Sequence, residues 1–155
     1  MIFFPVLGYC LDASCSRDLI FIRDEPKTWF ESPDLLAQYY CRYRLINGAL
    51  TWYEAQTFCR VKYTDLATVN NMDDENKLVA TLGSHVAHAW IGLRKGGGTG
   101  RWMWSDGSGI AHFTNWGDGE PNNVEGNEWC AEMSEKETWN DLSCGETKVF
   151  PCSKP

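Results

Sequence analysis

The sequence predicts an α+β fold: one disulfide-stabilised domain with two helices and several short strands. The chain has 155 residues, which is enough for one domain with a hydrophobic core but not comfortably for two. Eight tryptophans, seven phenylalanines and six tyrosines supply large apolar side chains for that core. Seven cysteines without any Cys-x-x-Cys pair favour disulfides over a zinc site. Because disulfides persist in oxidising compartments, the composition predicts a secreted or extracellular protein.

Residues 1–41 differ in pattern from the rest of the chain. Residues 1–14 begin with a short apolar run, Ile2–Gly8, and resemble a truncated signal peptide. Within residues 15–41, Thr28–Glu31 (TWFE) nearly repeats Thr51–Glu54 (TWYE), but Pro33 would block the helix that such a start predicts. We interpret residues 15–41 as a degenerate or truncated N-terminal extension, with chance similarity over this short segment as the alternative. The domain itself is predicted to span residues 42–155.

The first predicted elements of the domain are a strand over Tyr43–Ile46 and a helix over Trp52–Arg60. Thr51 and Glu54 match the capping box, with threonine at the N-cap and glutamate at N3, which begins a helix. Apolar residues then recur at helical spacing: Trp52, Ala55, Phe58 and Cys59.

A second helix is predicted to begin near Asp73 and to end at Gly83. Asp74 and Glu75 would interact favourably with the helix dipole at its N-terminus, and glycine is a common C-terminal stop. Val79 and Leu82 are expected to supply the buried face of this helix.

Strands are predicted over Ala89–Leu93 and Arg101–Trp104, joined by a glycine-rich hairpin turn over Gly96–Gly100. No Lys-Ser/Thr pair or helix follows these glycines, so the turn is not a phosphate-binding loop. From about residue 106 to residue 127 the chain shows little periodicity. Loops this long inside a compact domain are usually functional.

Acidic and amide side chains concentrate between Gly119 and Cys144. The chain carries a formal net charge of −7, and eight acidic residues but only one basic residue, Lys136, lie between Gly117 and Asp141. This charge disfavours nucleic-acid binding and docking to an anionic membrane. No apolar run approaches the ~20 residues of a transmembrane helix.

Five side chains between Gly119 and Cys144 carry the oxygens that hard cations prefer, which predicts a Ca²⁺ site. They are Glu120, Asn122, Glu128, Asn140 and Asp141.

From about Tyr39 to its end the chain resembles a C-type lectin-like domain, because several short motifs occur in that family's order and at fitting spacings. They are Trp52-x-Glu54-Ala55, Trp90-Ile91-Gly92-Leu93, Trp102-x-Trp104-Ser105-Asp106-Gly107, Asn115-Trp116, Glu120-Pro121-Asn122 and Trp139-Asn140-Asp141, with Cys59, Cys130, Cys144 and Cys152. The resemblance implies two helices, small antiparallel sheets and a long Ca²⁺-binding loop region. It also implies disulfides Cys59–Cys152 and Cys130–Cys144. Cys41 sits where long-form members carry an extra cysteine, so Cys15–Cys41 is the expected third bridge.

The resemblance further implies calcium-dependent carbohydrate binding. Glu120, Asn122, Glu128, Asn140 and Asp141 match the incomplete Ca²⁺ shell of sugar-binding members, in which two neighbouring sugar hydroxyls complete the coordination. The order Glu120-Pro121-Asn122 resembles mannose-type members, so mannose, GlcNAc or fucose glycans are the expected ligands and Pro121 is expected to be cis. Affinity for a single sugar should be weak, so useful avidity would need several domains, as in a homo-oligomer.

Departures from the family pattern lead to further expectations. Asn123 and Trp129 replace acids that form a second Ca²⁺ site in some members, so that site is expected to be absent or weak. Pro151 lacks an amide donor, so the last strand is expected to be frayed or shortened there.

Two other functions are alternatives to sugar binding. One is a lectin-like module that recognises protein or ice without sugar. The other is an enzyme with Glu120 and Glu128 as a glycosidase pair. The enzyme is disfavoured because the neighbouring amides serve no acid–base purpose, and because neither a Gly-x-Ser-x-Gly elbow nor a His-Glu-x-x-His motif occurs.

Overall fold

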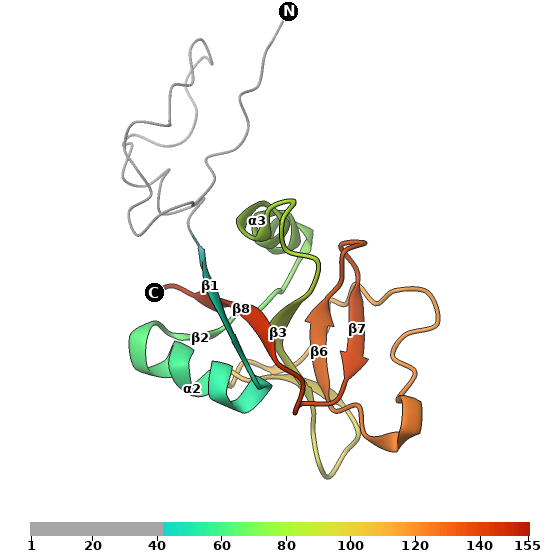
Figure 1. The fold of residues 1–155 in the computed structure, drawn as a ribbon. Helices are drawn as coiled ribbons and strands as arrows, with labels where there is room; N and C mark the ends of the chain where they lie inside the picture. The colour runs from blue at the N-terminus through green and yellow to red at the C-terminus, as the bar shows by residue number, and fades with distance from the viewer. Residues whose placement is uncertain (1–41) are drawn as a thin grey trace, which may run out of the picture.

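The computed structural model describes residues 42–155, which form two α-helices and eight strands (Figure 1). The helices are α2 (Trp52–Lys62) and α3 (Met72–Leu82), and a short 3₁₀ helix, η2, covers Val124–Gly126. The strands are β1 (Tyr43–Leu50), β2 (Asp65–Leu66), β3 (Ala89–Lys95), β4 (Trp102–Trp104), β5 (Gly109–Ile110), β6 (Cys130–Met133), β7 (Trp139–Leu142) and β8 (Lys148–Ser153). The expected signal peptide, N-terminal extension and Cys15–Cys41 bridge lie outside the described residues.

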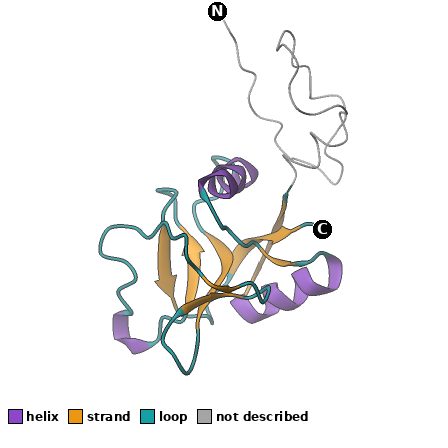
Figure 2. Ribbon diagram, turned by 180° about the vertical axis from the view of Figure 1, so that it is seen from behind, coloured by secondary structure: helices purple, strands orange, loops and turns teal. Residues whose placement is uncertain are grey.

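The strands form one branched sheet with the spatial order β1-β8-β3-β4-β5. Strand β2 also pairs with β8, and β6 pairs with both β3 and β7. All pairs are antiparallel except β3 with β8, which meet in parallel at Ala89 and Val149. Tyr43 of β1 lies opposite Ser153 of β8, so the two ends of the domain lie side by side. The long loop between β5 and β6 lies beyond β7, on the side of the molecule away from α2 (Figure 2).

The predicted α+β fold class and both disulfides of the domain are confirmed. Cys59–Cys152 joins α2 to β8, with a Cα–Cα distance of 5.4 Å, and Cys130–Cys144 has a Cα–Cα distance of 5.2 Å. The glycine-rich hairpin is also confirmed, because Leu93 pairs with Trp104 and the Gly96 amide donates to the Arg101 carbonyl (2.7 Å). Within residues 42–155 no helix has the length and apolar character needed to cross a membrane.

The last strand is intact at Pro151, so the expected fraying is wrong. Strand β8 is continuous from Lys148 to Ser153, and Pro151 lies opposite Leu45 of β1. The Pro151 carbonyl accepts a hydrogen bond from the Ala67 amide (3.0 Å), and the proline itself is buried. Proline lacks only the amide proton, so its carbonyl still bonds and its ring still packs in the interior.

Helix α2 begins as predicted. Thr51 Oγ1 accepts a hydrogen bond from the Glu54 amide (3.4 Å), and Glu54 Oε2 accepts one from the Thr51 amide (2.9 Å), which completes the capping box. Trp52, Ala55 and Cys59 form its buried face.

Helix α3 begins at Met72, where Asn71 acts as the N-cap by accepting a hydrogen bond from the Asp74 amide (2.8 Å). It ends at Gly83, whose φ of 67° suits glycine. Its apolar buried residues are Leu78 and Leu82, while Val79 is only partly buried. The prediction for Leu82 is confirmed, but Leu78 takes the place expected of Val79. The buried side of the helix continues from Asp74 and Glu75, which lie one turn before Leu78.

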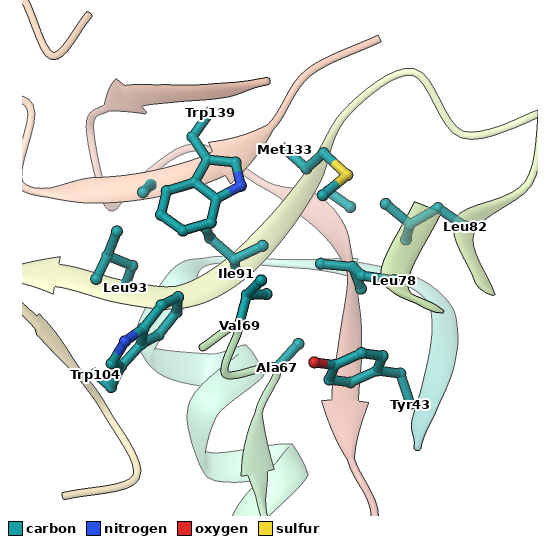
Figure 3. Packing of buried hydrophobic residues seen from close by; sticks show 12 residues of the cluster. Tyr43, Ala67, Val69, Leu78, Leu82, Ile91, Leu93, Trp104, Met133 and Trp139 are labelled. Carbon is teal, nitrogen blue, oxygen red and sulfur yellow. The ribbon is translucent and has the colours of Figure 1, made fainter. Parts of the chain in front are cut away.

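Two apolar clusters fill the interior. The larger lies between α3 and the sheet, and Figure 3 shows Leu78 and Leu82 of α3 beside Met133 and Tyr43. Trp139, which is fully buried in this cluster, meets Trp104 edge to face with ring centroids 5.8 Å apart. The smaller cluster surrounds the Cys59–Cys152 bridge beneath α2 and contains Trp52, Trp90 and Phe150. Because Trp139 directly precedes Asn140 and Asp141, the larger cluster anchors the strand that carries two of the predicted ligands.

Gly92 lets β3 approach β2 closely. A Cβ atom at this position would lie 3.0 Å from the carbonyl oxygens of both Leu66 and Ala67. The Gly92 amide donates a hydrogen bond to the Ala67 carbonyl at 2.8 Å. A larger residue would push these backbone atoms apart, which explains the glycine in the Trp90–Leu93 motif.

Candidate functional site

The long loop is tied at its start to strand β7. The Trp139 amide donates a hydrogen bond to the Asn115 carbonyl (2.8 Å), and the Gly117 amide donates to the Trp139 carbonyl (2.9 Å). Gly119 has a φ of 79°, in the left-handed region that glycine adopts without strain. The Glu120–Pro121 peptide bond is cis, as expected. The loop therefore begins against the strand that carries Asn140 and Asp141.

Asp141 fixes the middle of this loop. The residue is 1% exposed, and its carboxylate accepts hydrogen bonds from the backbone amides of Asn122 (3.0 Å) and Asn123 (2.8 Å). Hydrogen bonds to an ionised acceptor are about twice as strong as neutral ones. Asp141 thus holds the loop backbone against β7.

Three further predicted ligands join Asp141 in one hydrogen-bonded cluster. Asn122 Nδ2 donates to Glu120 Oε1 (2.8 Å). The Val124 amide donates to Glu128 Oε2 (2.7 Å) and to Asn122 Oδ1 (3.2 Å). The structure therefore brings Glu120, Asn122, Glu128 and Asp141 together, and their role as cation ligands stays a prediction.

Glu120 Oε2 is the one oxygen of this cluster that is shielded from solvent without a partner. It accepts no hydrogen bond from any residue within 42–155. Burial raises the pKa of Glu120 to about 7, together with the hydrogen bond that its protonated form donates to Asp141 and the repulsion from Asp141 and Glu128. A buried carboxylate oxygen without a donor, beside two other carboxylates, is an arrangement that a bound cation would stabilise.

Asn140 stands outside the cluster formed by the other four residues. It lies on β7 opposite Glu132 of β6, and its Nδ2 donates a hydrogen bond to Glu132 Oε1 (3.2 Å). Among the described residues, none donates a hydrogen bond to Asn140 Oδ1. This oxygen is therefore uncommitted, like Glu120 Oε2.

The donor set fits a hard cation. Three carboxylates and two amides offer oxygen atoms, and Ca²⁺ takes 6–8 oxygen ligands. Residues 42–155 contain no group of three or more His, Cys, Asp or Glu side chains that could hold a metal by themselves. The candidate centre instead combines carboxylates with asparagine amides, and its carboxylates are hydrogen-bonded to the loop. Binding a cation would exchange some of these hydrogen bonds for contacts between the cation and oxygen.

Strands β6 and β7 form the scaffold beneath this centre. They pair antiparallel from Cys130 opposite Leu142 to Met133 opposite Trp139. The Cys130–Cys144 bridge closes the end of the pair next to Glu128. The scaffold therefore connects the segment carrying Glu120–Glu128 to the segment carrying Asn140 and Asp141.

The residues expected to disable a second Ca²⁺ site have other partners. Asn123 Oδ1 accepts a hydrogen bond from the Glu128 amide (3.0 Å), and Asn123 has a φ of 48°. Trp129 is 40% exposed, with Lys95 Nζ 5.8 Å from its ring centroid. The absence of a second functional site stays a prediction.

Glu132 is a residue that sequence reasoning did not single out. It is 3% exposed, and its Oε2 lies 3.0 Å from Lys148 Nζ while its Oε1 lies 3.1 Å from His88 Nδ1. Oε2 receives no well-directed hydrogen bond, but the Lys148 ammonium compensates its charge. A signal was present in the sequence, because Glu132 interrupts the otherwise apolar run Cys130–Met133, and a buried acid needs partners.

Comparison with known proteins gives a consistent result. A family model described as the lectin C-type domain matches residues 48–154. Rat L-selectin is 34% identical over 115 residues, which cover 71% of this chain and 31% of L-selectin. The chain therefore spans less than a third of the length of that relative.

Solved structures agree with the family model. The C-type lectin CEL-I from Cucumaria echinata is 26% identical with a TM-score of 0.64, covering 70% of this chain and 86% of CEL-I. The cow carbohydrate-recognition domain of CD23, solved in the presence of a GlcNAc2Man3 oligosaccharide, is 27% identical with a TM-score of 0.62 and coverage of 72% and 85%. A Ca²⁺-dependent type II antifreeze protein in its Ca²⁺-free form has a TM-score of 0.66 at 23% identity, with coverage of 73% and 90%, and shares the fold.

Proposed function

Because this chain belongs to the C-type lectin domain family, we propose that it binds mannose-, GlcNAc- or fucose-type glycans in a calcium-dependent manner. One Ca²⁺ would be held by the five predicted ligands: Glu120, Asn122, Glu128, Asn140 and Asp141. The observation that carries the proposal is the buried, unpartnered Oε2 of Glu120 beside Asp141 and Glu128. The family is one of lectin domains rather than enzymes, which agrees with a binding role.

The side chains of the centre can recognise a sugar diol. When bound, Ca²⁺ supplies coordination positions that two neighbouring sugar hydroxyls can fill. Carboxylates only accept hydrogen bonds, so Glu120 and Glu128 would accept from these hydroxyls. The amides of Asn122 and Asn140 would donate to the same hydroxyl oxygens. Acids and amides together use both the proton and the lone pairs of each hydroxyl.

The surface around the centre favours weak binding of a single sugar. Asn122 is exposed, and Val124 beside it is 54% exposed. A contact on so open a surface buries little area, so we propose that several copies of the domain act together to reach useful avidity. The two disulfides indicate an extracellular domain, and we propose that the protein is secreted.

A second candidate function is a lectin-like module that recognises protein or ice without sugar. The finding that favours it is the antifreeze protein of the same fold, and this likeness concerns the fold alone. Competition by free mannose separates the two functions, because only sugar binding at the calcium centre would be displaced.

Affinity chromatography tests the proposal. The protein should be retained on mannose-agarose in Ca²⁺ and eluted by EDTA. The Glu120→Gln/Asn122→Asp variant exchanges the acid and the amide around Pro121 and should shift retention toward galactose-agarose. The Glu125→Gln variant is the matched control, because Glu125 is an exposed acid of the same loop, and it should behave as the parent. If the parent bound no mannose, GlcNAc or fucose column in Ca²⁺, the proposed function would be refuted.

A further inference from the structure

The side-chain amide of Asn140 has two ends with opposite chemistry, and only one of them can bind a cation. Its oxygen accepts hydrogen bonds and can ligate Ca²⁺, while its nitrogen only donates. An asparagine ligand therefore depends on some neighbour that distinguishes the two ends. The four other proposed ligands make hydrogen bonds with the loop, but within residues 42–155 the side chain of Asn140 bonds only to Glu132.

Glu132 is suited to orient this amide. Its carboxylate accepts but does not donate, so the end of Asn140 that faces it at 3.2 Å is the nitrogen. The oxygen of Asn140 is consequently turned away from Glu132. One N–H is used by Glu132, and the second N–H remains available.

Glu132 is itself held in place by residues that are far apart in the chain. It lies in β6 and is 3% exposed, Lys148 at the start of β8 contacts its Oε2, and His88 just before β3 contacts its Oε1. Because its two oxygens contact Lys148 and His88, which are far apart in the chain, this side chain has little freedom to rotate. The orientation that it imposes on Asn140 is therefore fixed by the sheet and not by the loop.

We propose that Glu132 is a positioning residue of the calcium centre, which sets the amide of Asn140 so that Oδ1 is free for the cation and the second N–H for a sugar hydroxyl. This inference rests on the proposed function. Outer groups that orient metal ligands typically contribute about tenfold to a hundredfold in metal affinity.

The Glu132→Gln variant should reverse the orientation. The Lys148 ammonium can only donate, so it would keep the glutamine oxygen on its own side. The glutamine nitrogen would then face Asn140 and favour its oxygen, which withdraws Oδ1 from the cation. By calorimetric titration with Ca²⁺ alone, the affinity of Glu132→Gln should fall by about tenfold or more.

A matched control separates orientation from structural damage. Arg60→Gln removes the ion pair between Arg60 and Asp65 (2.8 Å), which lies outside the calcium centre. It should lower the unfolding temperature in EDTA while leaving the affinity for Ca²⁺ close to that of the parent. An equal loss of affinity in Glu132→Gln and Arg60→Gln would overturn the inference.

The Asn140→Asp background gives a second, independent arm. An aspartate has two equivalent oxygens and needs no orientation, and Glu132 would repel it. Adding Glu132→Gln in this background should leave the affinity for Ca²⁺ unchanged or increase it. A loss as large as that in the Asn140 background would show a merely structural role and overturn the inference.

The last readout needs no bound calcium. In EDTA, the side-chain amide resonances of Asn140, observed by ¹H–¹⁵N NMR, should shift on Glu132→Gln because the carboxylate acceptor is lost. Unchanged resonances would overturn the inference whether or not the parent binds calcium. A parent that bound no Ca²⁺ by calorimetry would instead refute the proposed function, and with it the calcium role of Glu132.

Discussion

The Glu120→Gln substitution should stabilise the metal-free protein and at the same time abolish most of its stabilisation by calcium. A glutamine oxygen can still accept the hydrogen bond from Asn122 Nδ2, which Glu120 Oε1 accepts at 2.8 Å. The glutamine nitrogen would replace the buried Oε2, which has no donor, and could donate to the carboxylate of Asp141. The change therefore replaces the repulsion between ionised Glu120 and Asp141 with a hydrogen bond that no longer depends on protonation of residue 120.

The size of the stabilisation expected for metal-free Glu120→Gln follows from the cost of an unsatisfied buried polar group, about 1–3 kcal/mol. Glu120 is only partly buried, so a gain near the lower end, about 1 kcal/mol, is expected in EDTA at neutral pH. For a domain of this size such a gain raises the unfolding temperature by about 4 °C. In Ca²⁺ at 100 times Kd the parent should gain about 2.7 kcal/mol, and the variant much less because it has lost a ligand.

Thermal unfolding in EDTA and in Ca²⁺ measures both effects. The variant should be more stable than the parent in EDTA and less stable in Ca²⁺, while the control Glu125→Gln should follow the parent in both. If Glu120→Gln were less stable than the parent in EDTA, or if calcium stabilised both equally, the reasoning about Glu120 would be wrong.

The stability gain should depend on pH in a defined direction. The pKa of Glu120 is raised from 4.5 to about 7 in the folded protein, so between these values the folded state binds more protons than the unfolded state. By linkage, the free energy of unfolding of the metal-free parent should fall as pH rises through this window. Glu120→Gln should remove that contribution, which denaturant unfolding in EDTA at several pH values would show. If the free energy of unfolding depended on pH identically in the parent and in Glu120→Gln, the raised pKa could not belong to Glu120.

Three further predictions concern the scaffold and the ion count. Cys130→Ser/Cys144→Ser should lower the free energy of unfolding by about 3 kcal/mol, because the bridge closes a loop with a sequence separation of 14. The variant should also bind calcium more weakly. Denaturant titrations with and without Ca²⁺ would measure both effects. Leu78→Ala should cost about 2–5 kcal/mol, and the half-buried Val79→Ala clearly less, in the same assay. Calorimetry should give one Ca²⁺ per chain, since Trp129 stands where a second site would need an acid; a stoichiometry of two would refute this.

Elements with strong local signals could be predicted from the sequence. The capping box of Thr51 and Glu54 begins α2 because both hydrogen bonds form within a few residues. The glycine-rich turn gives the hairpin between β3 and β4 for the same reason. Four of the five proposed ligands also lie in one hydrogen-bonded cluster, and their role as ligands stays a prediction.

Features that depend on distant partners could not be predicted in this way. Strands β6 and β7 are four residues each and lie in an acidic stretch, so periodicity does not reveal them. Strand β8 tolerates Pro151 because Ala67, far away in the chain, bonds to its carbonyl. The buried side of α3 is centred on Leu78, with Val79 only partly buried, because the sheet decides which face is covered.

The sequence by itself determined which chemical groups are available at the centre: carboxylate and amide oxygens in a fixed order around Pro121, next to two cysteines that pair. Tertiary structure decided what each group faces. Asp141 bonds to amides 18 and 19 residues earlier in the chain, whereas Asn140, its immediate neighbour, bonds to Glu132 across the β6–β7 pair. These partners depend on strand register and on the path of the loop, which are set by packing across the whole domain and not by local residue order.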